Sequence, residues 1–300
     1  MGSIVYSDRK FLKIIYGQHN DSFTDYTKYR DADDETRNNI YHFIDSTEKT
    51  AIAVDCESPL DLTHKIYETK WRTSMKIATW NVERLKHRKS LAEIIAACEY
   101  TQADILILTE NDEAIKPKYQ NCCHTPTPPP LLLQGYDMPI TYAPTEHRVS
   151  IYTNYKMVRQ YTTFDRYTDL CLALETEKGN ILVYGTMIGI VGNRHPSFEA
   201  DLIKQIEDFR RFTAAGHNLC ICGDYNCSFS DNYYFTNSGR ERIVSSFSEC
   251  NIKLITAERS SCIDHIAVSE RFLGDSSVQI CEWNTDKALS DHKGISVQLV

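Results

Sequence analysis

The sequence predicts an α+β protein in which two β-sheets pack together and a few helices lie outside them. From residue 75 onward, apolar runs of strand length follow one another, bounded by Gly, Asn, Asp and Pro. Only a few segments have helical periodicity, and they are scattered between the strands. The 300 residues are 42% hydrophobic and 25% charged, which is an ordinary globular composition. This composition excludes a disordered chain, a collagen-like chain and a coiled coil.

The expected strands are short, apolar segments separated by turn-forming residues. They are residues 75–81, 103–110, 148–153, 170–175, 181–189, 219–222, 262–269, 278–283 and 295–300. Three amphipathic segments are expected to be helices, at 88–100, 199–212 and near 240–250.

Residues 1–74 differ in character from the rest of the chain. They are rich in Tyr and Asp and contain the acidic run Asp31-Ala-Asp-Asp-Glu35. Apolar patterns such as residues 11–16 and 40–44 are sufficient for folding or docking. The sequence therefore predicts an accessory region of unassigned role over 1–74 and a larger domain over 75–300.

Charge and hydropathy restrict the location and the partners of the chain. The net charge is −8, from 33 Lys and Arg against 41 Asp and Glu, so no broad basic face for coating nucleic acid is expected. A nucleic-acid enzyme remains compatible, because metal ions supply positive charge locally. The longest apolar run, residues 181–192, is shorter than the roughly 18 residues of a membrane helix. We expect a soluble, cytoplasmic protein with no membrane partner.

Eleven cysteines occur at irregular spacings, so a disulfide scaffold is not indicated. They are interpreted as small buried side chains in a reducing compartment. A zinc site at Cys220, Cys222 and Cys227 lacks a second Cys or His pair at zinc spacing.

Polar residues of one chemical kind end, interrupt or directly precede five of the predicted strands. The motifs are Trp80-Asn81, Thr109-Glu110, Gly223-Asp224-Tyr225-Asn226, Ile263-Asp264-His265 and Ser290-Asp291-His292. A desolvated carboxylate is costly without a partner, so these groups are expected to share a purpose. Oxygen-rich clusters of Asp, Glu and Asn suit a hard ion such as Mg²⁺ or Mn²⁺ rather than zinc. Phosphoryl transfer needs such a metal, a base for water and a donor to the phosphate, and all three residue types are present.

In this order, the five motifs resemble those of the endonuclease/exonuclease/phosphatase superfamily, the metal-dependent fold shared by DNase I-like nucleases and apurinic endonucleases. The resemblance covers residues 75–300. It implies a four-layer α/β/β/α sandwich of two packed mixed sheets, with Mg²⁺ or Mn²⁺ as cofactor.

The resemblance also implies roles for individual residues. Asn81 and Glu110 match the family's metal-site asparagine and glutamate, and Asp291 matches the aspartate beside the histidine that is often tied to a metal. Glu83 is a further, weaker candidate ligand.

The catalytic positions of the family are matched as well. Asp224 matches the residue that positions or deprotonates water, and Asn226 the one that orients phosphate or water. His292 matches the catalytic histidine and Asp264 its orienting carboxylate, which fixes the imidazole tautomer. Taken alone, Gly-Asp-Tyr-Asn is equally compatible with an ordinary Asx turn, and His265 is interpreted as structural.

One stretch departs from the family pattern. Nucleases of the family often carry a His or Tyr after the strand that here begins at residue 181, but this chain has Thr186 and Met187. Tyr184 lies nearby and is out of register. A second, histidine-type acid is therefore not expected.

The main hypothesis is divalent-metal-dependent hydrolysis of phosphodiesters, with nucleic acid as substrate and partner. Two alternatives remain, a phosphomonoesterase acting on a small phosphorylated metabolite and a non-catalytic phosphate-binding module.

Overall fold

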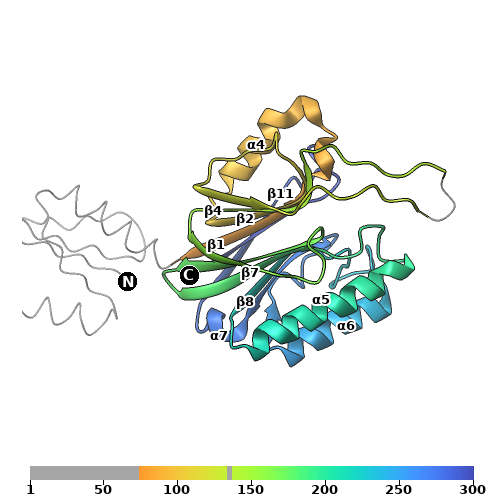
Figure 1. The fold of residues 1–300 in the computed structure, drawn as a ribbon. Helices are drawn as coiled ribbons and strands as arrows, with labels where there is room; N and C mark the ends of the chain where they lie inside the picture. Colours follow the sequence, from red (N-terminus) through yellow and green to blue (C-terminus); the bar gives the residue numbers. More distant parts are fainter. Residues whose placement is uncertain (1–73, 134–136) are drawn as a thin grey trace, which may run out of the picture. The chain divides into compact units, whose positions relative to one another are not determined.

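The computed structural model describes residues 74–133 and 137–300, and residues 74–300 form one compact unit. Two six-stranded sheets pack face to face, with helices on their outer surfaces (Figure 1). This is the α+β class and the α/β/β/α sandwich that the sequence predicts. The expected accessory region lies, apart from Ser74, outside the described residues.

The first sheet holds the strands that begin and end the domain. In spatial order it contains β11 (Val278–Trp283), β12 (Gly294–Leu299), β1 (Met75–Asn81), β2 (Ile105–Asp112), β4 (Glu146–Thr153) and β3 (Asn121–His124). The central pair β1 and β2 is parallel, with Asn81 opposite Thr109, and the other pairs are antiparallel.

The second sheet is built in the same way around another parallel pair. Its order is β5 (Lys156–Tyr161), β6 (Asp169–Thr176), β7 (Gly179–Met187), β8 (Leu219–Asp224), β10 (Asp264–Ser269) and β9 (Ile252–Leu254). Here β7 and β8 are parallel, and β8 pairs antiparallel with β10.

Three hydrophobic clusters separate the four layers. The first fills the space between the sheets, with Ile107, Val149 and Val183 among its fully buried members. The second lies between the second sheet and the helices α5 (Pro196–Ala214) and α6 (Asn237–Glu249). The third lies between the first sheet and α4 (Leu91–Tyr100). A short helix, α7 (Glu270–Leu273), and the 3-10 turns η1 (Glu83–Leu85) and η2 (Arg88–Ser90) complete the domain.

All nine predicted strands and all three predicted helices are present, with boundaries that differ by at most a few residues. The strands β3, β5 and β9 escape the sequence prediction. Each lies at or next to the edge of a sheet, and β5 and β3 have no fully buried residue. The sequences of these three strands are short or interrupted by polar residues, so they lack the apolar run on which the prediction depends.

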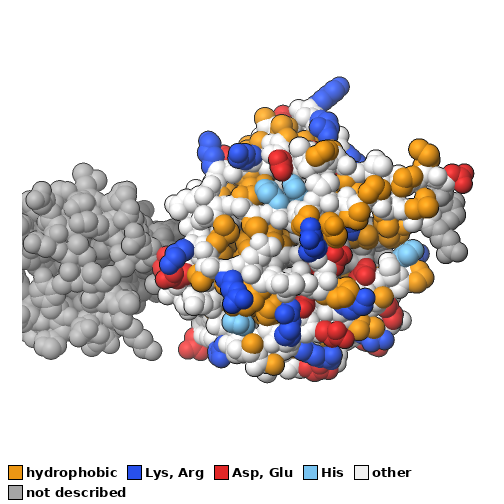
Figure 2. Space-filling view, in the orientation of Figure 1, with side chains coloured by type: hydrophobic (Ala, Val, Ile, Leu, Met, Phe, Trp, Pro, Cys, Tyr) orange, Lys and Arg blue, Asp and Glu red, His pale blue; other side chains and the backbone are white. Residues whose placement is uncertain are grey.

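The surface carries charges of both signs. Lys and Arg side chains lie among acidic and apolar ones on the face shown in Figure 2, without forming a continuous basic stripe. Within the described ranges, no helix is long and apolar enough to cross a membrane. The ten cysteines of those ranges are free thiols, and seven of them are buried.

Candidate active site

The ends of four strands bring polar side chains together at one end of the sandwich. Asn81 ends β1 and Glu110 lies near the end of the parallel neighbour β2. In the other sheet, Asp224 ends β8 and is paired with Asp264 at the start of β10. The Asn81 side chain spans the two sheets, because its Nδ2 donates a hydrogen bond to Asp224 Oδ2 at 3.1 Å.

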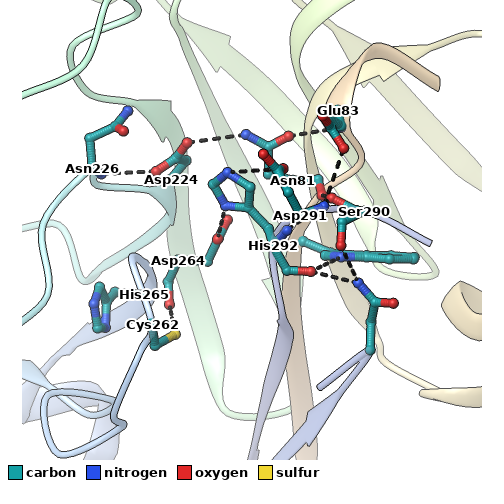
Figure 3. A network of polar contacts seen from close by, with 12 residues as sticks. Asn81, Glu83, Asp224, Asn226, Cys262, Asp264, His265, Ser290, Asp291 and His292 are labelled. Carbon is teal, nitrogen blue, oxygen red and sulfur yellow. Dashed lines mark hydrogen bonds and ion pairs between the residues drawn. The ribbon is translucent and has the colours of Figure 1, made fainter. Parts of the chain in front are cut away.

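His292 lies between these carboxylates (Figure 3). Its Nδ1 is 2.6 Å from Asp264 Oδ2, and its Nε2 is 3.7 Å from Asp291 Oδ1. The first distance is that of a strong charge-assisted hydrogen bond, and the second is too long for one. The Nε2–H of His292 is therefore available to a ligand.

The protonation of this group differs from that of isolated side chains. Burial lowers the pKa of His292, but the negative charges of Asp264, Asp224 and Asp291 outweigh this effect and raise it to about 10. Burial raises the pKa of Asp224 to about 7, with Asp264 adding to the rise and His292 opposing it. At neutral pH the histidine is a cation, and Asp224 is divided between its two forms.

The loop that carries His292 is anchored to β1. Trp80 Nε1 donates to the His292 carbonyl at 3.0 Å, and Ser290 Oγ donates to the Asn81 carbonyl at 2.7 Å. Asn284 Nδ2 donates to the carbonyls of both Ser290 and His292. Trp80 is fully buried in the core, and its indole N–H also positions the histidine.

A tight turn presents Asp224 and Asn226. Asp224 Oδ1 accepts a hydrogen bond from the Asn226 backbone N–H at 2.8 Å, which is the Asx turn considered from the sequence. Asn226 has a φ of +48° and donates its Nδ2 to the carbonyls of Ile188 and Gly189. The turn does not exclude a role in the site, because it directs the Asp224 carboxylate toward Asn81 and His292 (Figure 3).

The remaining acidic candidates lie on the side of the first sheet. Burial raises the pKa of the Glu110 carboxyl, and the charge of His292 and the Asn81 side chain oppose this rise. Glu83 accepts a hydrogen bond from the Asp291 N–H at 3.2 Å and another from Lys86 Nζ. The side chain of Asp291 is 65% exposed, so it lies at the rim of the site.

These donors fit a hard divalent cation. Within the described residues, Asp264 Oδ1 is buried without a hydrogen-bond partner, and the Glu110 carboxyl has no cation hydrogen-bonded to it. A positive ion beside either carboxyl offsets the cost of its uncompensated charge. Ligand atoms of Asp224, Asp264 and His292 also lie within 4.8 Å of one another, although the cationic state of His292 makes its imidazole a poor ligand.

The end of β7 provides no proton donor, in agreement with the sequence. The Thr186 hydroxyl is buried and bonded to Asp169 at 2.9 Å and to Gln205 at 3.0 Å. Met187 is buried, and Tyr184 donates its hydroxyl to Asp208 on the side of the sheet that faces the helices.

His265 is adjacent to Asp264 in sequence but lies outside the site. It is fully buried, with Nδ1 2.9 Å from Thr256 Oγ1 and Nε2 3.0 Å from the Cys227 carbonyl. Burial lowers its pKa to about 4, so it is neutral. This geometry agrees with a structural role.

A pocket of about 250 Å³ opens beside His292. It is lined by Asn226, Asp264, Asp291 and His292, and also by residues that the sequence analysis did not single out: Tyr233, Tyr234, Lys287 and Lys293. These four residues lie in loops without a recognisable motif. The only sequence signal was their closeness to Asn226 and His292 along the chain.

Comparison with known proteins agrees with this geometry. Residues 78–292 match the model of the Endonuclease/Exonuclease/phosphatase family. The chain belongs to this family. The family comprises hydrolytic phosphoesterases, including nucleases and phosphatases. No curated protein matches the sequence significantly.

Solved structures of the family share the fold at low sequence identity. The 3′ phosphatase NExo from Neisseria, bound to a product DNA hairpin, is 16% identical with a TM-score of 0.53, covering 75% of this chain and 99% of its own. An AP endonuclease from Archaeoglobus fulgidus is 13% identical with a TM-score of 0.53, covering 74% and 98%. Beta toxin from Staphylococcus aureus, a mutant with bound magnesium ions, is 14% identical with a TM-score of 0.50, covering 75% and 99%. At these identities the likeness establishes the fold alone.

Proposed function

We propose that the domain of residues 75–300 hydrolyses phosphodiester bonds in nucleic acid with the help of Mg²⁺ or Mn²⁺. The observation that supports this most is the group Asp224, His292 and Asp264, in which an imidazolium lies between two buried carboxylates next to a pocket. Membership of a phosphoesterase family supports the same reaction class.

In this proposal His292 stabilises negative charge on the phosphate. A pKa of about 10 keeps it protonated at neutral pH, and Asp264 holds its Nδ1–H. The free Nε2–H then donates to a phosphate oxygen, and the imidazolium charge offsets the charge that develops there.

Asp224 is proposed to orient the attacking water and to accept its proton. A pKa of about 7 matches a base that acts near neutral pH, because a sufficient fraction is ionised while the affinity for a proton stays high. Its oxygens are held by Asn81 Nδ2 and by the Asn226 backbone N–H, which fixes the direction of attack. The Asn226 Oδ1, to which no described residue donates, is available to water or to the ester.

Asn81, Glu110 and Asp291 are proposed to hold the cation, with Glu110 as the principal ligand. When bound, the ion supplies positive charge that offsets charge on the phosphate and the leaving oxygen. No side chain at the end of β7 replaces it as a leaving-group donor, since Thr186 is bonded internally.

Hydrolysis of supercoiled plasmid, single-stranded DNA and RNA, each with Mg²⁺, Mn²⁺ or EDTA, tests the proposal. We expect metal-dependent cleavage by the wild type and a loss of at least about 10²-fold in Asp224→Ala and in His292→Ala, the usual contribution of a catalytic group. The matched control is Asp275→Ala, which removes an exposed aspartate. Retention of more than about a tenth of the activity in both site variants would contradict the assignment.

The size of the pocket favours a second candidate. Its volume of about 250 Å³ is close to the lower end of the roughly 300–1,000 Å³ range of small-molecule sites, so a small phosphorylated metabolite is the second candidate substrate. Turnover of para-nitrophenyl phosphate with no cleavage of any polymer would favour this phosphomonoesterase. Failure on all substrates, together with the absence of metal binding by calorimetry, would favour a non-catalytic phosphate-binding module.

A further inference from the structure

The pocket extends from the candidate active site toward a lysine and a tyrosine that have no part in the proposed chemistry. Its lining joins Asp264, Asn226 and His292 to Tyr233 and Lys287. Lys287 Nζ donates a hydrogen bond to the Tyr233 hydroxyl at 2.7 Å and lies 5.0 Å from the centre of its ring. The two side chains come from loops that are 54 residues apart.

The charge of Lys287 is not neutralised by a carboxylate in the part of the chain that the structure describes. The other lysine of the pocket, Lys293, differs in this respect, because its Nζ contacts Glu282 at 2.8 Å and the Ser260 carbonyl at 2.7 Å. Lys287 Nζ has two more N–H groups, and the Tyr233 hydroxyl, having accepted a bond, keeps its own proton to donate. Together they offer donors and one positive charge to an anion.

Both loops are held in place, so the pair is organised in advance. Asn284 Oδ1 accepts from the Leu289 N–H, and Asn284 Nδ2 bonds the Ser290 and His292 carbonyls, which links the loop of Lys287 directly to the histidine. Asp231 accepts from the backbone N–H groups of Tyr233 and Ser261, which braces the other loop. A ligand with two covalently linked groups is recognised best when the residues that bind them, here Lys287 and His292, are held at a fixed distance from each other.

Tyr233 is 48% exposed, although it lines the pocket. An exposed aromatic face beside a cation is the combination with which proteins hold single-stranded nucleic acid, by stacking a base and contacting the backbone. Because the molecule has a net charge of −8 and no basic stripe on the face shown in Figure 2, local cations of this kind matter more for its affinity.

We propose that Lys287 and Tyr233 form a subsite for the nucleotide next to the scissile bond, with Lys287 contacting its phosphate and Tyr233 stacking on its base. This subsite rests on the proposed nuclease function, and it specifies which residues hold the nucleic-acid strand in the site. It also favours a polymer over a lone phosphomonoester, because a monoester has no second phosphate for Lys287.

Equilibrium binding of a fluorescent oligothymidylate, measured over a range of salt concentrations, tests the subsite. The full chain is used with Mg²⁺ in an Asp224→Asn background, so that hydrolysis does not intervene. Loss of one contact to a phosphate of a single strand decreases the magnitude of the slope of log binding constant against log salt concentration by about 0.7. We expect this decrease in Lys287→Ala, a preserved slope in Lys287→Arg, and no change in the control Lys253→Ala, which removes an exposed lysine of β9.

The tyrosine is tested in the same assay. Stacking of one base corresponds to about 5- to 150-fold in affinity. We expect a loss in this range for Tyr233→Ala and a smaller one for Tyr233→Phe, which keeps the ring and removes the hydroxyl. An oligonucleotide with uncharged methylphosphonate linkages should make the lysine variant and its parent bind equally.

Failure of the subsite and failure of the proposed function give different results. A salt slope that Lys287→Ala leaves unchanged, or the absence of oligonucleotide binding by the parent, overturns the subsite even if the wild type cleaves nucleic acid. A slope that depends on Lys287 in a protein that cleaves no polymer overturns the nuclease and supports Lys287 as a contact to a bound single strand.

Discussion

At the scale of single residues, the site depends on carboxylates and a histidine that alter one another's protonation. His292 is held as a cation because Asp264 is 2.6 Å away and Asp224 is close. The same cation opposes the rise that burial causes in the pKa of Asp224. Because each group sets the other's charge, substitution of one changes the chemistry of both.

His265 gives a prediction at this scale about stability and pH. Its folded pKa of about 4 lies below the ordinary value of about 6.5, so its contribution to stability is present above pH 6.5 and is lost as the pH falls toward 4. From pH 7 to pH 5 this loss is about 2 kcal/mol in the free energy of unfolding. We therefore expect the stability difference between the wild type and His265→Gln to shrink by about 2 kcal/mol over that interval.

Urea unfolding of both proteins at the two pH values measures this change. Taking the difference between them cancels the opposite pH dependence of Asp224, whose folded pKa is raised to about 7. A difference that is the same at pH 7 and pH 5 would mean that folding does not lower the pKa of His265.

At the scale of elements, the position of Asp224 depends on how closely β8 approaches β7. Gly223 has a φ of +145°, and a Cβ built on it lies 2.0 Å from the Thr186 carbonyl oxygen, which is part of the backbone. Only glycine adopts this φ without strain and has no Cβ to clash with the carbonyl oxygen. Asp224 is the next residue along β8, so the close approach of β8 to β7 sets its position.

Gly223→Ala should accordingly be more destabilising than a glycine substitution at an open position. The matched control is Gly179→Ala, which also has a positive φ, +104°, but has no atom within 4 Å of the built Cβ. We expect Gly223→Ala to cost at least about 2 kcal/mol more than the control in urea unfolding. Equal costs would show that β7 moves aside without difficulty.

The elements also show where prediction from sequence reaches its limit. Central strands such as β1 and β8 are predicted because burial on both faces requires a continuous apolar run. β5 has no fully buried residue, so its conformation is decided by backbone hydrogen bonds to β6, a partner that no local pattern identifies.

At the scale of the whole molecule, the three hydrophobic clusters found among the described residues span residues 75–299. We expect a protein of residues 75–300 alone to unfold cooperatively and to retain metal-dependent hydrolysis, because both the core and the site are inside it. Circular dichroism during thermal unfolding, together with the plasmid assay, measures this. A fragment that is folded but inactive would assign residues 1–74 a part in the site, and an unfolded one would contradict the domain boundary.

The sequence by itself determined the family, the two-sheet class and seven candidate site residues, because strand-end motifs and apolar runs are local patterns with a physical cause. It also indicated that Thr186 is no proton donor. The family resemblance also implied the pairing of His292 with Asp264. Only the tertiary structure decided that Asn81 meets Asp224 across the two sheets and that Lys287 meets Tyr233. These two contacts join residues that are 143 and 54 positions apart. The pairing of strands and the paths of loops set such distances, and neither is a property of any local stretch of chain.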